Sequence, residues 1–193
     1  MRVTKAQAQA NRARIVDTAS VLFREQGYDG VGVAQLMAAA GFTHGGFYRH
    51  FRSKVGLMLE AATSAFSQTA NRVAGLDIVG FVKYYTSREH RDHRGEGCAM
   101  AALCADVARQ PEEVKAIFAA GVEGMLSSLL HESNALTDVD QRAMRARTID
   151  VLAHAVGAVV ISRACPDDSP LADEILEVCR LAILGSISPS ADH

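Results

Sequence analysis

The chain has 193 residues, of which 49% are hydrophobic and 22% charged, a composition typical of a folded protein rather than a disordered one. No apolar run reaches the roughly 18 residues that a membrane span requires, and the N-terminus lacks the apolar core of a signal peptide, so we expect a cytoplasmic protein without membrane contact. The net charge is −2, but residues 1–55 hold eight Lys and Arg against three Asp and Glu, whereas the remainder holds twelve against nineteen.

A basic end on an acidic body favours binding of a polyanion by that end. Chance clustering on a solvated face would give the same imbalance, so the charge alone does not decide. Cys98, Cys104, Cys165 and Cys179 are too sparse for a disulfide scaffold, and in a reducing compartment we expect them to be thiols.

Apolar residues recur at helical spacing along nearly the whole chain, and no alternating pattern indicates a strand. Gly27 and Gly41 stand where the first two helices would stop, and Pro111 interrupts a later one. The charged segment 87–97 has no periodicity, so we expect a loop there. The sequence therefore predicts an all-α fold of about nine helices. They are expected near residues 15–27, 33–40, 44–51, 53–66, 78–87, 98–109, 112–131, 137–164 and 171–185.

The segment GFTHGGFYRHFRSK, residues 41–54, combines adjacent glycines with aromatic and cationic residues. Each glycine inside a helix costs roughly 1 kcal/mol against alanine, so the pair needs a reason. Two short helices joined by a tight turn at Gly41 form a helix-turn-helix, whose second helix enters the DNA major groove. Phe47 and Phe51 would then face inward, while Gly45 and Gly46 let the backbone approach bases. The alternative is a kinked aromatic helix docked inside a bundle.

Another face of this third helix carries His44, Tyr48 and Arg52 at four-residue spacing. This is the face that we expect to contact DNA. Lys54 falls in the first turn of the fourth helix, where free N–H groups and an ammonium together suit a phosphate.

The strings RIVDTASVLFREQGYDG, VAQLMAAAGFTHGGFYRHF and SKVGLMLEA resemble the DNA-binding domain of the TetR/AcrR family of bacterial transcription regulators. The resemblance implies a DNA-binding domain over 9–69 and a helical ligand-binding and dimerisation domain over 70–193. It places Thr43, His44 and Gly45 at or near bases, and Tyr48, His50 and Lys54 at phosphates. The full expected DNA-binding set is Thr43, His44, Gly45, Gly46, Tyr48, Arg49, His50 and Lys54.

The sequence departs from the family pattern just before the second helix. The family often has Thr or Ser before the second helix, where this chain has Val31 and Gly32, so backbone N–H groups must replace a hydroxyl there.

The resemblance also implies a symmetric dimer, and the apolar surface of the last two helices suits a four-helix interface, unless one subunit buries it alone. The expected interface residues are Val151, Ala155, Val159, Leu171, Ile175, Val178 and Ala182.

The same resemblance implies that the central body holds a cavity for an unidentified small-molecule inducer. Its candidate lining residues are apolar apart from one histidine, and each of them suits plain core equally well. They are Met100, Leu103, Phe118, Met125, Leu129 and His154.

His90, His93, Cys98 and Cys104 are competent zinc ligands, but their spacing matches no compact zinc motif, so we expect no metal and no other cofactor. Cys98 opens a helix, where the dipole lowers a thiol pKa, so a redox- or electrophile-sensing regulator is an alternative to a simple packing role. Catalytic and nucleotide-binding fingerprints are missing from the sequence, which argues against an enzyme.

The sequence therefore predicts a ligand-responsive transcriptional regulator. We expect a repressor that binds a palindromic operator in double-stranded DNA as a homodimer and is released by its inducer. A helical enzyme or an interaction module without DNA binding is the remaining alternative.

Overall fold

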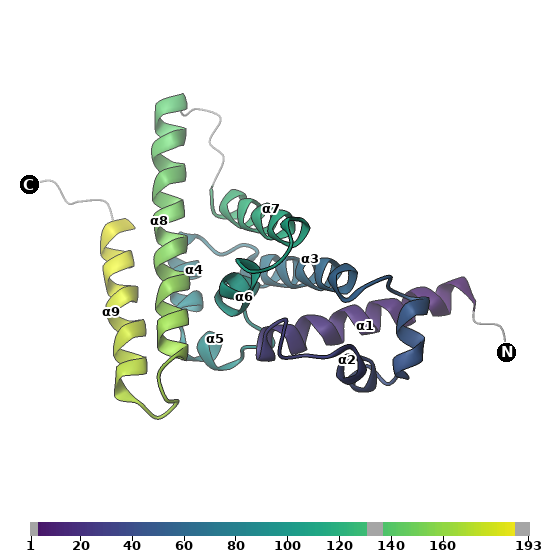
Figure 1. Cartoon of the computed structure of the whole chain (residues 1–193). Coiled ribbons are helices and arrows are strands. Elements are labelled where there is room, and N and C mark those ends of the chain that lie inside the picture. Colours follow the sequence, from purple (N-terminus) through teal and green to yellow (C-terminus); the bar gives the residue numbers. More distant parts are fainter. Residues whose placement is uncertain (1–3, 131–136, 188–193) are drawn as a thin grey trace, which may run out of the picture. The chain divides into compact units, whose positions relative to one another are not determined.

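The computed structural model describes residues 4–130 and 137–187 (Figure 1). Within these ranges the chain contains helices and no strand, which confirms the predicted all-α fold. None of the described helices is long and apolar enough to cross a lipid bilayer. The elements are α1 (Lys5–Gln26), α2 (Val33–Ala39), the 3-10 helix η1 (His44–Arg49), α3 (Lys54–Val73), α4 (Ile78–Tyr85), α5 (Arg88–Asp92), α6 (Ala99–Val107), α7 (Glu112–Leu129), α8 (Asp138–Arg163) and α9 (Pro170–Ile187).

The structure differs from the expected helices in four places. Helix α1 begins at Lys5 rather than near residue 15, and α3 continues to Val73 rather than residue 66. The third helix is a 3-10 helix rather than an α-helix. The expected loop 87–97 was wrong in part, because Arg88–Asp92 forms the short helix α5. Ser87 caps it by accepting a hydrogen bond from the N–H of His90 at 3.1 Å. Apolar periodicity could not reveal α5, because its buried side chains, His90 and Arg91, are polar.

The described residues form two compact units. The first draws on residues 4–69 and 94–121, and the second on residues 70–93, 122–130 and 137–187. The functional boundary expected after residue 69 remains a prediction. The first unit also includes α6 and the first part of α7, a segment that the resemblance places in the ligand-binding domain.

In the first unit, α1 supplies the centre of the core through Ile15, Ala19 and Phe23, which are fully buried. Helix α6 packs against α1. The carboxylate of Asp106 on α6 accepts a hydrogen bond of 3.0 Å from the N–H of Tyr28, just beyond the end of α1. This contact gives a hydrogen-bond partner to the N–H of Tyr28, which lies outside the helix.

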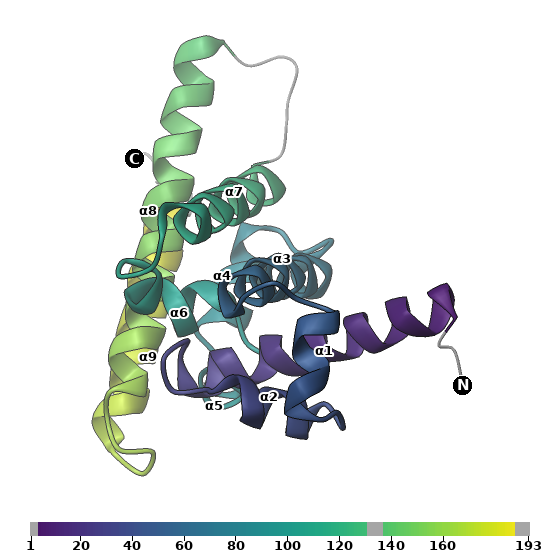
Figure 2. The same cartoon turned by 45° about the vertical axis from the view of Figure 1, so that its right-hand side comes forward.

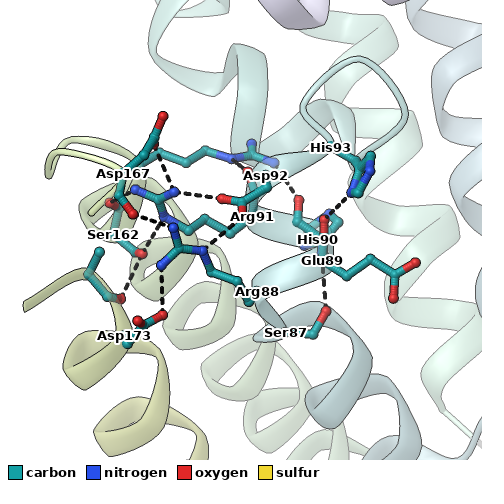
Figure 3. Close-up of polar contacts among 12 residues, drawn as sticks. Ser87, Arg88, Glu89, His90, Arg91, Asp92, His93, Ser162, Asp167 and Asp173 are labelled. Atoms are coloured by element: carbon teal, nitrogen blue, oxygen red, sulfur yellow. Dashed lines mark hydrogen bonds and ion pairs between the residues drawn. The ribbon is translucent and has the colours of Figure 1, made fainter. Parts of the chain in front are cut away.

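In the second unit, α8 and α9 lie side by side as an antiparallel pair (Figures 1 and 2). A buried guanidinium joins this pair to α5 (Figure 3). Arg91 is 1% exposed and donates to Ser162 Oγ at 2.9 Å, to the Ser162 carbonyl at 3.0 Å and to Asp167 Oδ1 at 2.9 Å. Ser162 in turn donates to the carbonyl of Ala172 on α9 at 2.8 Å. A buried charge is tolerated only with such partners.

Candidate nucleic-acid interface

The two helices that precede the candidate site both end at a glycine. Helix α1 stops at Gly27, which has a φ of 77°, and α2 stops before Gly41, which has a φ of 82°. At the second stop the N–H of Gly41 donates to the Ala38 carbonyl at 3.0 Å, and that of Phe42 to the Met37 carbonyl at 2.8 Å. This pair of bonds is a Schellman motif, which requires a left-handed residue at the position of Gly41. The chain then turns into η1.

The inner face of η1 is aromatic. Phe47 is 1% exposed and Phe51 is 3% exposed, and their rings stack with centroids 5.6 Å apart. Helix α2 packs against η1. The prediction that these two phenylalanines face inward is confirmed, and their burial fixes which residues of η1 face solvent.

The outer face of η1 is polar and open. Thr43, His44, Gly45, Tyr48 and Arg49 are exposed, and Tyr48 reaches 70%. A Cβ added to Gly45 would meet no atom within 4 Å. The fold therefore does not require a glycine at this position.

Gly46 has a different environment. It is half-buried, and an added Cβ would lie 3.6 Å from the Met37 side chain, an ordinary contact distance. Neither Gly45 nor Gly46 has a positive φ.

His50 and Lys54 of the expected set are only half-exposed, and both contact other residues of the first unit. The carbonyl of His50 accepts a hydrogen bond from Arg12 Nη1. Lys54 opens α3 as expected, but its ammonium donates to the carbonyl of Tyr28. An ammonium has three donors, so this contact anchors Lys54 and leaves two donors for an outside anion.

The start of α2 lacks a side-chain cap, as the sequence indicates. Gly32 is the N-cap without a side-chain hydrogen bond, and Val31 is fully buried. Thr43 is the residue that the sequence offers as a cap for η1, but its hydroxyl accepts no capping hydrogen bond. Sequence reasoning did not identify Arg12, which contacts both His50 and Glu60. Its partners lie 38 and 48 residues away in the chain, and no local pattern indicates such contacts.

The candidate inducer-lining residues fall into both units. Met100, Leu103 and Phe118 are buried in the first unit, and Met125 and Leu129 are buried in the second. His154 is exposed on α8. Leu129 also lines a pocket of about 240 Å³ in the second unit. The other residues around this pocket are Asp77, Ile78, Leu130, Met144, Arg147, Thr148 and Ile187.

The candidate interface residues on α8 are buried, whereas those on α9 are exposed or half-buried. Val151, Ala155 and Val159 on α8 are each at most 1% exposed and pack within the chain. On α9, Leu171, Val178 and Ala182 are exposed, and Ile175 is half-buried. Helix α8 has a second apolar stripe, which sequence reasoning did not identify as its exposed face. It consists of Ile149, Ala153 and Val160, which are exposed, and Val156, which is half-buried.

The histidines and cysteines have local roles in the structure. His90 is buried, and its Nδ1–H donates to the Tyr85 carbonyl at 2.7 Å. Burial lowers the pKa of His90 to about 4. Cys98 is 1% exposed at the N-cap of α6. Across the described ranges, no three His, Cys, Asp or Glu side chains form a group able to hold a metal ion.

Comparison with known sequences gives a match centred on this region. Residues 15–61 match the family model of the bacterial regulatory proteins of the tetR family. Over 59 residues the chain is 41% identical to the HTH-type transcriptional regulator AcrR of Shigella flexneri. This match covers 31% of the chain and 27% of the relative, so the chain aligns with little more than a quarter of that relative's length.

Solved structures resemble the chain over nearly its full length. E. coli NemR in its reduced form aligns with a TM-score of 0.73 at 18% identity, covering 95% of this chain and 100% of NemR. A TetR-family transcriptional regulator from Cytophaga hutchinsonii aligns with a TM-score of 0.69 at 16% identity, covering 96% of this chain and 98% of the regulator. At these identities the likeness shows a shared fold.

Proposed function

Because residues 15–61 match the tetR family of bacterial regulatory proteins, we propose that the chain is a TetR/AcrR-type transcriptional regulator, which binds a palindromic operator as a homodimer and represses transcription until a small molecule releases it. Repression would follow from occupation of a promoter site. Release requires only a modest coupling between inducer binding and DNA binding, since a coupling free energy of about 1–3 kcal/mol changes DNA affinity 5- to 150-fold.

The exposed face of η1 carries this proposal. His44, Tyr48 and Arg49 face solvent above the buried pair Phe47 and Phe51, and the surface at Gly45 is open. A short helix anchored by its apolar side can present hydrogen-bond donors to base edges and phosphates. The uncapped N–H groups at the start of α2 supply further donors to the backbone of DNA.

Exposed apolar side chains on α8 and α9 support assembly into a homodimer. Ile149, Val160, Leu171, Val178 and Leu181 are between 42% and 59% exposed. A monomer rarely leaves so much apolar surface on two adjacent helices in water. A second copy of the same helix pair would cover it with twofold symmetry, which also matches a palindromic operator.

The pocket of about 240 Å³ in the second unit is the site that we propose for the inducer. Its walls combine apolar side chains such as Ile78 and Leu129 with the polar groups of Asp77, Arg147 and Thr148. This combination of an apolar lining with a few polar groups is common in small-molecule sites. The volume suits a ligand smaller than a typical drug.

DNA binding is tested by fluorescence anisotropy with a random duplex at low salt, and then with a duplex selected from a random-sequence pool by the protein itself. We expect affinity for both duplexes to fall with salt. Tyr48→Phe should weaken both by roughly 1 kcal/mol through a lost hydrogen bond. His44→Ala should reduce the preference for the selected duplex by about 1–3 kcal/mol.

Tyr84→Phe on α4 is the matched control, since it removes the same hydroxyl from the second unit. It should bind both duplexes as the wild type does. A wild-type protein that binds neither duplex at low salt would rule out the proposed function.

A further inference from the structure

Arg12 on α1 contacts two other elements of the first unit. Its Nε donates to Glu60 Oε2 on α3 at 3.0 Å, and its Nη2 donates to the other oxygen of the same carboxylate. Its Nη1 donates to the carbonyl of His50, the residue directly after η1. Its Cζ lies 4.3 Å from the centroid of the Phe51 ring. One guanidinium therefore connects α1, α3 and the end of η1.

The end of η1 depends on such a contact more than a longer helix would. Helix η1 has six residues and 3-10 geometry, which gives weaker hydrogen bonds than an α-helix. The last carbonyls of any helix also need partners outside it. A guanidinium satisfies one of these carbonyls and interacts favourably with the negative end of the helix dipole.

We propose that Arg12, held by Glu60, is a positioning residue for operator reading. It fixes the C-terminal end of η1 against α1 and α3, and thereby the orientation in which His44 and Tyr48 reach DNA. The inference rests on the proposed DNA-binding function and adds to it a residue outside the DNA-facing set. The planar guanidinium of Arg12 donates to both carboxylate oxygens of Glu60 and to the carbonyl of His50 at the same time, which a lysine ammonium cannot do.

The positioning role is separable from a role in stability. The side chains of Arg12 and Glu60 are 40% and 41% exposed, and ion pairs at that exposure contribute little to folding. Both also border an open groove of about 620 Å³ along α1 and α3, so a replacement side chain has room. Substitution should therefore alter the placement of η1 without unfolding the first unit.

The test compares Arg12→Met, Arg12→Lys and Glu60→Gln with a charge-matched control, Arg14→Met. Arg14 lies on the same helix, and its guanidinium is 5.8 Å from the centroid of the Phe42 ring. Dissociation constants are measured by anisotropy at several salt concentrations on two probes. One probe is the duplex selected by the wild type from a random-sequence pool, and the other is an unrelated duplex of equal length.

We expect Arg12→Met to weaken binding of the selected duplex about tenfold, the effect of losing one charge-assisted hydrogen bond. Its affinity for the unrelated duplex and its salt dependence should match those of Arg14→Met. Arg12→Lys should not restore the selected-duplex affinity, and Glu60→Gln should fall between the wild type and Arg12→Met.

Amide hydrogen exchange gives a second readout that needs no DNA. The N–H groups of His50 and Phe51 both donate to the Phe47 carbonyl at 2.9 Å. We expect them to exchange about tenfold faster in Arg12→Met, because the end of η1 opens more often. The amides of Leu36 and Ala40 at α2 should keep their wild-type rates in both variants.

The outcomes are distinct. Equal weakening on both duplexes with a salt dependence reduced by about one counterion would make Arg12 a phosphate contact and overturn the proposal. Wild-type affinity and wild-type exchange in Arg12→Met would also overturn it. If the wild type selects no duplex, the proposed function fails, and the exchange rates alone decide whether Arg12 positions η1.

Discussion

Gly45 and Gly46 are adjacent on η1, yet only Gly45 is open to solvent. The space around Gly45 is free of neighbouring atoms, so a larger side chain can be added there without strain in the fold. This makes Gly45 a sensitive probe of close contact with a partner. At a packed position the same substitution would also disturb the fold, and a loss of DNA affinity could then come from misfolding.

We predict that Gly45→Leu folds normally and loses its preference for the selected duplex, because the added side chain holds η1 out of the groove. The loss should approach the usual gap between specific and non-specific binding, about 10³-fold or more. Anisotropy measures binding, and circular dichroism checks folding. Gly124→Leu on α7 is the control, since a Cβ there also meets no atom within 4 Å. Wild-type affinity in Gly45→Leu would show that the glycine does not serve DNA binding.

His90 is the second informative single residue, because burial lowers its pKa from 6.5 to about 4. The unfolded chain therefore binds a proton at His90 at pH values where the folded chain does not. Stability from this group is present above pH 6.5 and is lost as the pH falls from about 6.5 to about 4. The full loss is on the order of 3 kcal/mol.

We predict that His90→Gln flattens this pH dependence, since an amide keeps a donor for the Tyr85 carbonyl without titrating. The measurement is the free energy of unfolding by urea between pH 7 and pH 4. His93→Gln is the control, because His93 is exposed beside α5. An unchanged acid sensitivity in His90→Gln would assign the effect to other groups.

At the scale of elements, polar contacts rather than apolar ones hold α5 to the corner between α8 and α9 (Figure 3). Arg91 is central to them. Its loss would remove a charged donor from the buried Ser162 hydroxyl and from the Ser162 carbonyl. Arg88 forms exposed ion pairs with Asp92 and Asp173 in the same region and offers a comparison on the same short helix.

We predict that Arg91→Met lowers the free energy of unfolding by roughly 3 kcal/mol, because buried acceptors lose a charged donor. Arg88→Met should shift the denaturant midpoint much less, since its partners remain solvated. Urea denaturation followed by circular dichroism measures both. Equal midpoints for the two variants would show that burial does not distinguish these arginines.

At the scale of the whole molecule, the exposed apolar stripes of α8 and α9 bear on assembly. Val178 is 58% exposed on α9, in line with Leu171 seven residues earlier. A charge placed there meets water in a monomer and apolar surface in a dimer. The fold of the single chain should tolerate the change.

We predict a wild-type homodimer and a monomeric Val178→Glu variant, because burying an unpaired carboxylate at an interface is strongly unfavourable. Light scattering after size-exclusion chromatography at micromolar concentration measures the mass. Val139→Glu is the matched control, since Val139 is 74% exposed near the start of α8 and outside the stripe. A monomeric wild type, or a dimeric Val178→Glu, would contradict the proposed interface.

The sequence predicted the elements well wherever local chemistry sets them. Gly27 and Gly41 end helices because both positions have a positive φ, and Phe47 and Phe51 mark the buried side of η1. The prediction was wrong in part for 87–97, because Arg91 is buried by hydrogen bonds that no apolar period reveals. The functional assignments at η1, in the pocket and at the interface remain predictions.

By itself, the sequence determined the all-helical fold, the helix-turn-helix and the resemblance of its N-terminal part to the tetR family, since caps, turns and motif strings depend on residues a few positions apart. Only the tertiary structure decided which apolar stripe of α8 is exposed, because Val151, Ala155 and Val159 alternate with an equally apolar stripe on the next face. It also decided that Arg12 contacts His50 and Glu60 and that Lys54 contacts Tyr28. These pairings join residues 26 to 48 positions apart, and only the packing of helices against one another brings them together.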